Sequence, residues 1–413
     1  MVFNLIHLYY VYGHLYIGHC TLKIGGGVLN IGIFTDTYLP ETNGVAVSTK
    51  MLKDELRVLG HNAYIITTAN PGRRKFEHGV FTLPSVPFAF LPSRRVGAVY
   101  SNRVRRIIKR LGLDIVHTHT EFSIGFFGRI NARAMRVPVV HTYHTIYKDY
   151  VHYLKIARFS RLTARMVKSF TRSYCSGCKA VIVPTKKTYD LLDEYGLKNE
   201  MHIIPTGINL SMFSDENFRG DDIERLRASY GIGDSDRVLL YVGRVSKEKS
   251  IDVIVRAFPS ILDMTPGLKL VIVGEGPALD SLASLSRSLG VSESVVFTGD
   301  VPWSKVAAYY RLGDVFVSAS KSETQGLTYI EAMASGLPVV AVRDDCLDGI
   351  VVDGESGFIF DDAGELPGLI CRIMGDGDLR LRVGRNALLS AQRFSRENYA
   401  KSVLGVYEKV LGG

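Results

Sequence analysis

Short apolar runs alternate along this chain with longer segments in which apolar residues recur every three or four positions. The first run covers residues 30–35, and the segment 45–60 repeats its apolar residues at helical spacing up to Gly60. A second apolar run follows at 62–68. This order of strand, helix and strand is the βαβ unit of a parallel sheet with right-handed crossovers.

The alternation continues to the end of the chain in two series. The first adds strands predicted at 114–117, 137–142 and 180–184. The second starts near Arg237 and adds strand-like runs at 268–273, 295–299, 315–319 and 338–342, again separated by helical patterns. The sequence therefore predicts an α/β fold of two doubly wound, Rossmann-like domains.

Turn residues without periodicity mark the joint between the two series. A length of 413 residues exceeds one ordinary core, and the segment 203–209, I-I-P-T-G-I-N, carries no helical or strand pattern. We predict an N-terminal domain over 29–205 and a C-terminal domain over 206–395. Residues 396–413 are predicted to form a helix that packs back on the N-terminal domain.

The first 28 residues are aromatic and lack the basic start and the cleavage site of a secretory signal. An extension, an interfacial anchor and a mis-assigned translation start remain open for 1–28. The last is favoured because the first good strand begins at Asn30.

Composition narrows the class of protein. Apolar residues make up 46 % of the chain and charged residues 22 %, as in soluble globular proteins. Five unevenly spread cysteines do not form a disulfide framework, which favours a reducing cytoplasm. His117 and His119 alternate at a predicted strand end, but no convincing third ligand follows, so we predict no metal and no cofactor.

Charge is divided unequally between the two halves. Residues 1–205 carry 28 Lys and Arg against 12 Asp and Glu, whereas the remainder carries 22 against 29. Between Tyr147 and Phe170, cations alternate with aromatic and aliphatic residues at near-helical spacing, which fits an anionic membrane surface. A solvated helix packed on the core remains an open interpretation. Nucleic acid is not predicted as a partner, because no nucleic-acid motif is present and the aromatic residues share one apolar face.

Two glutamates give the most specific chemical pattern. Glu323 lies in a polar loop after a strand-like run, and Glu331 lies in the predicted helix 327–335. The backbone N–H groups of Gln325, Gly326 and Leu327 lie between them at the helix start, where phosphate binds readily. Two carboxylates beside an anion site suit a sugar nucleotide. The alternative is a capping Glu323 and a solvated Glu331.

Other candidates follow the ends of other predicted strands. Arg244 and Lys249 lie five residues apart in a loop and can converge on a diphosphate. Gly44, in T-N-G-V, allows close backbone approach at the start of a helix. His144, in H-T-Y-H-T, follows the strand at 137–142.

Together these motifs resemble, in the same order, the markers of retaining glycosyltransferase family 4. The resemblance rests on N-G-V at 43–45, the H-T-Y-H-T box, G-R with Lys249, the two glutamates and G-L-P-V-V at 336–340. It extends from about Asn30 to the C-terminus. The segments F-T-D-T-Y-L-P-E-T-N-G-V-A and D-D-C-L-D-G-I-V-V-D-G-E-S-G-F look most similar to the diacylglycerol glucosyltransferase branch.

The resemblance implies the GT-B arrangement, two Rossmann-like domains facing across a cleft, and a role for each motif residue. Arg244 and Lys249 would neutralise the donor diphosphate in place of a metal, aided by the N–H groups of 325–327. Glu323 would bind the transferred hexose and Glu331 the nucleotide ribose. His144 would stand beside the donor sugar, and Gly44 would let its loop approach the phosphates and the acceptor.

The expected reaction is transfer of a hexose from a nucleotide sugar, such as UDP-glucose, to a hydroxyl of a membrane lipid such as diacylglycerol. The expected location is the cytoplasm, at the inner face of the membrane. Retention without a matching carboxylate nucleophile favours attack from the leaving-group side. A soluble acceptor, a sugar-nucleotide epimerase of the same architecture and a non-catalytic binder are the alternatives.

Overall fold

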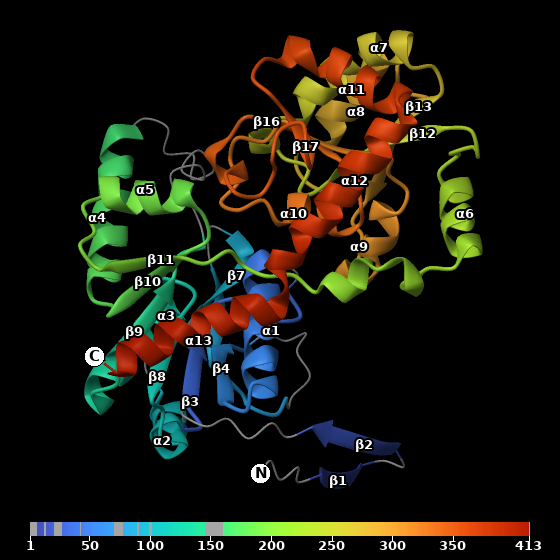
Figure 1. Ribbon diagram of the computed structural model, residues 1–413. Coiled ribbons are helices and arrows are strands. Elements are labelled where there is room, and N and C mark those ends of the chain that lie inside the picture. Colours follow the sequence, from blue (N-terminus) through green and yellow to red (C-terminus); the bar gives the residue numbers. More distant parts are fainter. Residues whose placement is uncertain are drawn as a thin grey trace.

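The structure is a computed structural model that describes residues 6–11, 14–19, 27–41, 43–69, 77–88, 91–98, 101–144 and 160–412. It has two α/β domains, and the C-terminal helix of the chain lies on the N-terminal one (Figure 1). Both domains are built on parallel sheets. The predicted fold class, two doubly wound α/β domains, is therefore confirmed.

The sheet of the N-terminal domain has seven parallel strands in the order β11-β10-β9-β8-β3-β4-β5. Their bounds are β3 Asn30–Phe34, β4 Asn62–Thr68, β5 Val80–Leu83, β8 Ile115–Thr118, β9 Val139–Thr142, β10 Ala180–Val183 and β11 Glu200–Ile203. The first strand, β3, lies inside the sheet because the chain winds first to one side of it and then to the other. The helices of this domain are α1 Gly44–Val58, α2 Asn102–Leu111, α3 Ser123–Met135, α4 Ser160–Ser176 and α5 Lys186–Glu194.

The helix predicted from apolar spacing between 45 and 60 is α1. Its start is fixed by Asn43, whose side chain accepts a hydrogen bond from the N–H of Ala46 at 3.0 Å. Leu52 and Leu56 are fully buried beneath the sheet. The left-handed conformation of Gly60, with φ of 90°, lets the chain turn directly into β4.

The C-terminal domain repeats this winding with six parallel strands in the order β14-β13-β12-β15-β16-β17. The strands are β12 Arg237–Val242, β13 Leu268–Val273, β14 Val295–Gly299, β15 Val315–Ser318, β16 Val339–Val342 and β17 Gly357–Phe360. The helices are α6 Gly220–Ser229, α7 Ile251–Met264, α8 Leu279–Ser288, α9 Trp303–Tyr310, α10 Leu327–Ala334, α11 Leu366–Gly375 and α12 Gly377–Ala391. Short 3₁₀ turns include η3 Leu210–Phe213, η4 Asp215–Asn217, η5 Lys247–Lys249, η6 Asp345–Leu347, η7 Ala363–Glu365 and η8 Gln392–Phe394.

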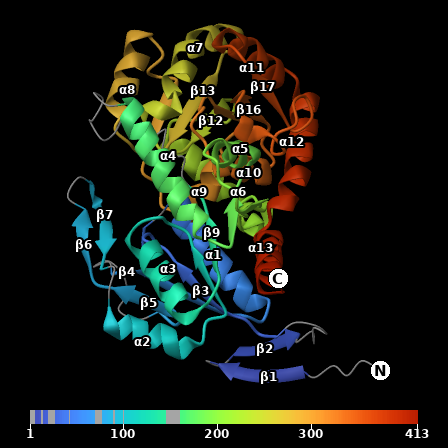
Figure 2. The ribbon, with the colours of Figure 1, turned by 90° about the vertical axis from the view of Figure 1, so that its left-hand side faces the viewer.

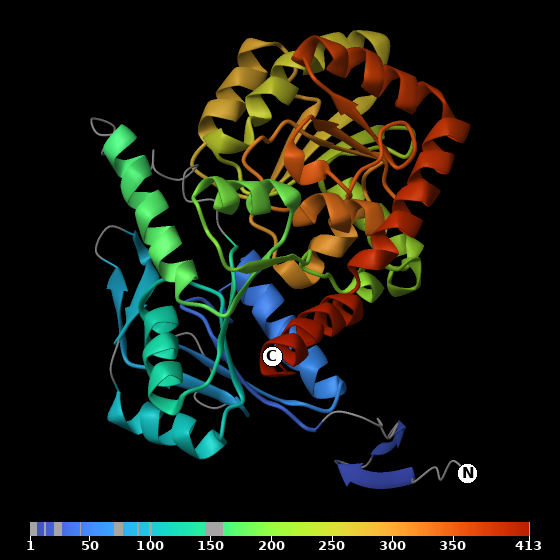
Figure 3. The same cartoon turned by 60° about the vertical axis from the view of Figure 1, so that its left-hand side comes forward.

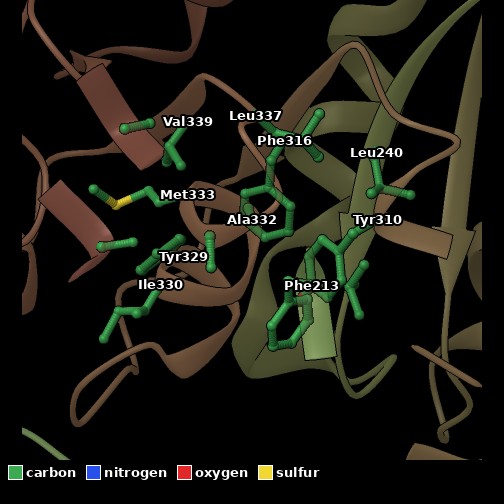
Figure 4. Packing of buried hydrophobic residues seen from close by; sticks show 14 of the residues in the cluster. Phe213, Leu240, Tyr310, Phe316, Tyr329, Ile330, Ala332, Met333, Leu337 and Val339 are labelled. Atoms are coloured by element: carbon green, nitrogen blue, oxygen red, sulfur yellow. The ribbon is translucent and has the colours of Figure 1, made fainter. Parts of the chain in front are cut away.

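Both faces of this second sheet are covered, so its strands are apolar on both sides. Leu240 packs on one face and Leu239 on the other. Figure 4 shows the first of these cores, where the buried ring of Tyr329, on α10, packs near those of Phe316 and Tyr310. This packing holds α10, the helix that carries Glu331, rigidly against β15.

Two antiparallel hairpins are not part of the parallel sheets. β6 Ser85–Phe88 pairs with β7 Leu91–Gly97. β1 Ile6–Val11 pairs with β2 His14–His19, and these two strands join no other sheet of the described residues. The sequence pattern predicts no strand before Asn30, so the hairpin of β1 and β2 was missed.

The two domains are joined by two crossings of the chain that lie side by side. The N–H of Ile208 donates to the carbonyl of Phe394, and the N–H of Arg396 donates to the carbonyl of Ile208. From there α13, Arg396–Gly412, packs across α1, as Figure 3 shows in red and blue. α13 buries Tyr399, Val403 and Tyr407 in the core of the N-terminal domain.

The helix expected between Tyr147 and Phe170 is described only from Ser160 onward, as the first part of α4. Residues 147–159 lie outside the described residues. Among the helices that the structure describes, none is both long and apolar enough to cross a membrane.

Candidate active site

In each domain the chain reverses its winding direction beside the first strand of the sheet, between β3 and β8 and between β12 and β15. Ligands of open α/β sheets bind in the crevice outside the carboxyl ends of such strands. Here both crevices open into one cleft of about 2030 Å³ between the domains. Its walls include every residue predicted to form the site, namely Gly44, His144, Arg244, Lys249, Glu323, Gln325, Gly326, Leu327 and Glu331.

The two cations predicted to bind a diphosphate follow β12. Arg244 is an exposed side chain at the cleft wall, and Lys249 ends the short turn η5. The ammonium of Lys249 lies 2.6 Å from Oε1 of Glu323, and the two side chains are 13 % and 18 % exposed. Glu323 is thus held by a cation from a neighbouring loop. It does not cap α10, which has no side-chain capping bond.

The N-terminus of α10 opens into the same cleft. Gly326 precedes it in the left-handed conformation, with φ of 71°, and a Cβ there would lie 2.3 Å from the ring of Tyr329. Only glycine fits at this position. With no side-chain cap, the N–H groups at the helix start are available to an anion, favoured by the helix dipole.

Glu331 is a partly buried carboxyl that accepts a hydrogen bond of 2.8 Å from the hydroxyl of Tyr310. Burial raises the pKa of Glu331 to about 7, and the bond from Tyr310 opposes this shift. The alternative of a solvated Glu331 is therefore wrong. A carboxylate at the cleft wall with one fixed partner keeps further acceptor sites for the hydroxyls of a ligand.

The raised pKa of Glu331 predicts a pH-dependent stability. Since the folded protein holds this proton up to about pH 7 and a free glutamate loses it near 4.5, the folded state loses stability as pH rises through that window. Glu331→Gln should remove this loss, which is worth roughly 3 kcal/mol. Thermal unfolding would show a larger gain in melting temperature for the variant at about pH 7.5 than at about pH 5. An equal difference in melting temperature between variant and wild type at both pH values would contradict the raised pKa of Glu331.

On the opposite wall, Gly44 begins α1 and faces the C-terminal domain. A Cβ built on Gly44 would lie 3.5 Å from Cδ1 of Leu327, the first residue of α10. The N-termini of α1 and α10 thus approach each other across the cleft. The backbone of the first domain therefore comes close to the start of α10 in the second domain.

His144 follows β9 and belongs to a buried histidine network. Its Nε2 lies 2.8 Å from Nδ1 of His119, and the two rings stack. Burial lowers the pKa of His144 to about 3, and the pKa of His119 is also lowered by burial, so both rings are neutral. His117 is bonded instead to Thr142 and to Tyr407 of α13, so His117 and His119 serve as packing and hydrogen-bonding groups.

The sequence interpretation missed residues that shape the site. Asp36, at the carboxyl end of β3, accepts hydrogen bonds from Thr120, Ser123 and the N–H of Ile124, and burial raises its pKa. Its position after a strand could have marked it. No sequence pattern marks Lys187, although its side chain donates a hydrogen bond to the carbonyl of Glu323. No group of three or more His, Cys, Asp and Glu side chains in the described ranges could hold a metal ion.

Two doubly wound domains with one site between them define a GT-B type of fold, and a solved structure shares it. The Anabaena protein HepE, solved in complex with UDP and glucose, superposes with a TM-score of 0.72 at 18 % identity, covering 92 % of this chain and 99 % of its own. At this identity the similarity establishes the fold.

Sequence comparison establishes the family. Residues 42–212 match Glycosyltransferase Family 4, and residues 222–389 match Glycosyl transferases group 1. The alpha-monoglucosyldiacylglycerol synthase of Streptococcus pneumoniae is 38 % identical over 92 % of this chain and 85 % of its own. The enzyme of that name from Acholeplasma laidlawii is 36 % identical over 92 % of this chain and 96 % of its own. This chain belongs to the same glycosyltransferase family, and the predicted glycosyltransferase is confirmed.

Proposed function

We propose that this glycosyltransferase moves glucose from UDP-glucose to the free hydroxyl of diacylglycerol, with retention and without a metal. The observation that carries the proposal is the similarity of nearly the whole chain to two enzymes named for that product. The described site is consistent with the chemistry, because its cations, its carboxylates and a helix N-terminus line one cleft.

The donor half of the reaction follows from the charges. Negative charge develops on the nucleoside diphosphate as the glycosidic bond breaks, so cations and N–H donors placed there in advance lower the barrier. Arg244, Lys249 and the start of α10 would supply them. Glu323, fixed by Lys249, would accept hydrogen bonds from the hexose, and Glu331 would accept them from the ribose.

The acceptor half would proceed from the side of the leaving group. The acceptor hydroxyl attacks the anomeric carbon, and its proton passes to an oxygen of the departing diphosphate. Two carboxylates on the acceptor side, Asp36 and Glu121, are engaged within the N-terminal domain, the first by three donors and the second by His141 at 3.1 Å. Attack from the side of the leaving group uses neither of them as a nucleophile. Neutral His144 would contact the donor sugar.

An apolar surface beside the cleft supports a lipid acceptor. α3 exposes Phe122, Phe126 and Ile130, spaced four residues apart, and α4 exposes Met166 and Phe170. The rings of Phe126 and Phe170 lie 6.2 Å apart, so the exposed residues of the two helices form one surface, which we call the α3–α4 patch. Figure 2 shows the two helices next to each other. Exposed apolar patches of this kind mark protein or membrane contacts. Phe122, Phe126 and Phe170 also line the cleft, which connects the patch to the site.

Cations accompany this patch. Arg165 and Arg172 are exposed on α4, and the first half of the chain holds the positive charge. Basic residues beside exposed apolar side chains suit the anionic inner leaflet of a membrane. We therefore propose that the protein binds peripherally at the cytoplasmic face, with the patch towards the lipid.

An assay with purified protein tests the function. Incubation with UDP-glucose and diacylglycerol in mixed micelles should give a monoglucosyl lipid of α configuration, identified by mass spectrometry and NMR, with chelator present throughout. UDP-glucose replaced by other sugar nucleotides serves as the control for donor choice. Absence of any glucosyl lipid under these conditions would refute the proposal.

Substitutions in the α3–α4 patch are expected to weaken membrane binding without changing UDP binding. Ile130→Ser with Met166→Ser should weaken binding to vesicles of anionic lipid by about 10-fold or more, because two exposed apolar side chains leave the bilayer boundary. Neither residue lines the cleft, so UDP affinity should stay unchanged. Leu389→Ser, on an apolar residue of α12 that is more exposed than either, is the control in a flotation assay. Vesicle binding equal to that of the control would contradict the proposed orientation.

A further inference from the structure

A lysine of the N-terminal domain, which was not among the predicted site residues, forms hydrogen bonds with the loop that carries Glu323. Lys187, in the first turn of α5, donates from Nζ to the carbonyl of Glu323 at 3.2 Å and to the carbonyl of Lys321 at 3.1 Å. These bonds reach the backbone of the C-terminal domain from a helix of the other domain. In Figure 3, α5, in green, lies against the C-terminal domain, where it contacts η6.

The same ammonium is paired with a carboxylate of the C-terminal domain. Nζ of Lys187 lies 2.7 and 2.8 Å from the two carboxylate oxygens of Asp344, which follows β16. The two side chains are only 19 % and 8 % exposed. Asp344 is itself fixed, because its Oδ1 accepts a hydrogen bond from the N–H of Cys346. All four oxygens around this cation therefore belong to the C-terminal domain.

Two further contacts hold the loop on the carboxyl side of Glu323. Thr185, which caps the start of α5, donates from its hydroxyl to the carbonyl of Thr324 at 2.8 Å. Gln325 turns its side chain to the interdomain linker, where its amide pairs with both the N–H and the carbonyl of Thr206 at 2.8 and 2.9 Å. The loop is thus bonded to the N-terminal domain and the linker at 321, 323, 324 and 325.

These contacts depend on the relative position of the domains. Lys187 moves with the N-terminal domain and its acceptors move with the C-terminal domain, so opening the cleft separates them. Separation of a largely buried ion pair leaves uncompensated charge on both sides until water enters. The closed arrangement is therefore the one in which the backbone beside Glu323 receives its hydrogen bonds.

We infer that Lys187 is a positioning residue of the transfer reaction, which fixes the Glu323 loop only when the two domains are closed. The hexose-binding carboxylate then reaches its working position through closure, when water is also excluded from the cleft. This inference rests on the proposed role of Glu323. It assigns Lys187 no contact with the substrate.

The test compares Lys187→Met with Lys186→Met, a neighbouring exposed lysine whose partner, Asp190, lies on its own helix. Three quantities are measured: UDP affinity, turnover with saturating substrates, and the radius of gyration in solution with UDP bound. UDP affinity is followed through Trp303, which lines the cleft and is the one tryptophan of the chain. Asp344→Asn removes the ion pair but keeps an oxygen for the N–H of Cys346.

We expect Lys187→Met to lower turnover about 10- to 100-fold, since misplacement of a binding group has effects of that order. UDP affinity should change less than about threefold, and the radius of gyration should increase as closure is lost. Asp344→Asn should have the same effects as Lys187→Met. The double variant, Lys187→Met with Asp344→Asn, should lose no more turnover than Lys187→Met alone. Lys186→Met should match the wild type in all three quantities.

Three outcomes would overturn the inference. Unchanged turnover in Lys187→Met removes the positioning role. Equal losses of turnover and UDP affinity indicate general damage to the fold. Reduced turnover with an unchanged radius of gyration removes the link to closure. If diacylglycerol proves not to be the acceptor, UDP affinity and the radius of gyration still decide the effect on closure, so failure of the proposed function is distinguishable from failure of this inference.

Discussion

Replacement of Glu323 by Ala is expected to lower turnover by at least about 100-fold while UDP binding is retained, because the carboxylate is assigned to the hexose and not to the diphosphate. The structure sharpens this expectation. In the wild type, Glu323 pairs with the ammonium of Lys249 at 2.6 Å, so its removal takes away one partner that competes with the phosphates for that cation. UDP affinity should therefore be equal to or tighter than that of the wild type.

The measurement pairs steady-state kinetics with UDP titration followed through Trp303. Glu323→Gln is the informative companion variant, since it keeps the size and an acceptor oxygen but loses the charge. A fall in UDP affinity that equals the fall in turnover would place Glu323 at the diphosphate and contradict its assignment to the sugar.

Replacement of Arg244 or Lys249 by Ala should remove UDP binding and turnover together. Each cation is assigned to the diphosphate in both the bound donor and the transition state, and a hydrogen bond to a charged group contributes about 1.5–3 kcal/mol. We expect UDP affinity to fall about 10- to 100-fold in each single variant, with a further loss in turnover.

Lys247→Ala is the matched control, because Lys247 is an exposed lysine of the same short turn that does not line the cleft. It should bind UDP as the wild type does. Because Lys249 also fixes Glu323, Lys249→Ala with Glu323→Ala should lose less turnover than the two single effects combined. Retained UDP affinity in both Arg244→Ala and Lys249→Ala would refute the metal-free arrangement proposed for the donor site.

Local sequence was sufficient for the elements that carry the site. Strands of both domains show unbroken apolar runs because both faces of each sheet are buried. Helix α10 was predicted at 327–335, one residue longer than observed, since Gly326 and Gly336 bound it. Candidate residues could be found because ligands bind where parallel strands end, and strand ends are visible in the sequence.

Contacts between distant segments could not be predicted in this way. The pairing of Lys249 with Glu323 and of Lys187 with Asp344 joins residues 74 and 157 positions apart. No periodicity relates such residues, because each lies in a loop or helix end whose neighbours are set by how the sheets and domains pack. The same holds for the raised pKa of Glu331, which results from the packing around it.

The sequence by itself determined the class of fold, the position of nine candidate residues at strand and helix ends, and the unequal charge of the two halves, since these depend on composition and on spacing along the chain. Only the tertiary structure decided that those residues share one cleft and that α3 and α4 form an apolar patch beside it. It also decided that Lys187 of the N-terminal domain forms hydrogen bonds with the loop that carries Glu323. Each of these features requires two surfaces to meet, either between the domains or between two helices. The free energy of such contacts depends on distances in space, and neighbouring residues in the sequence do not determine those distances.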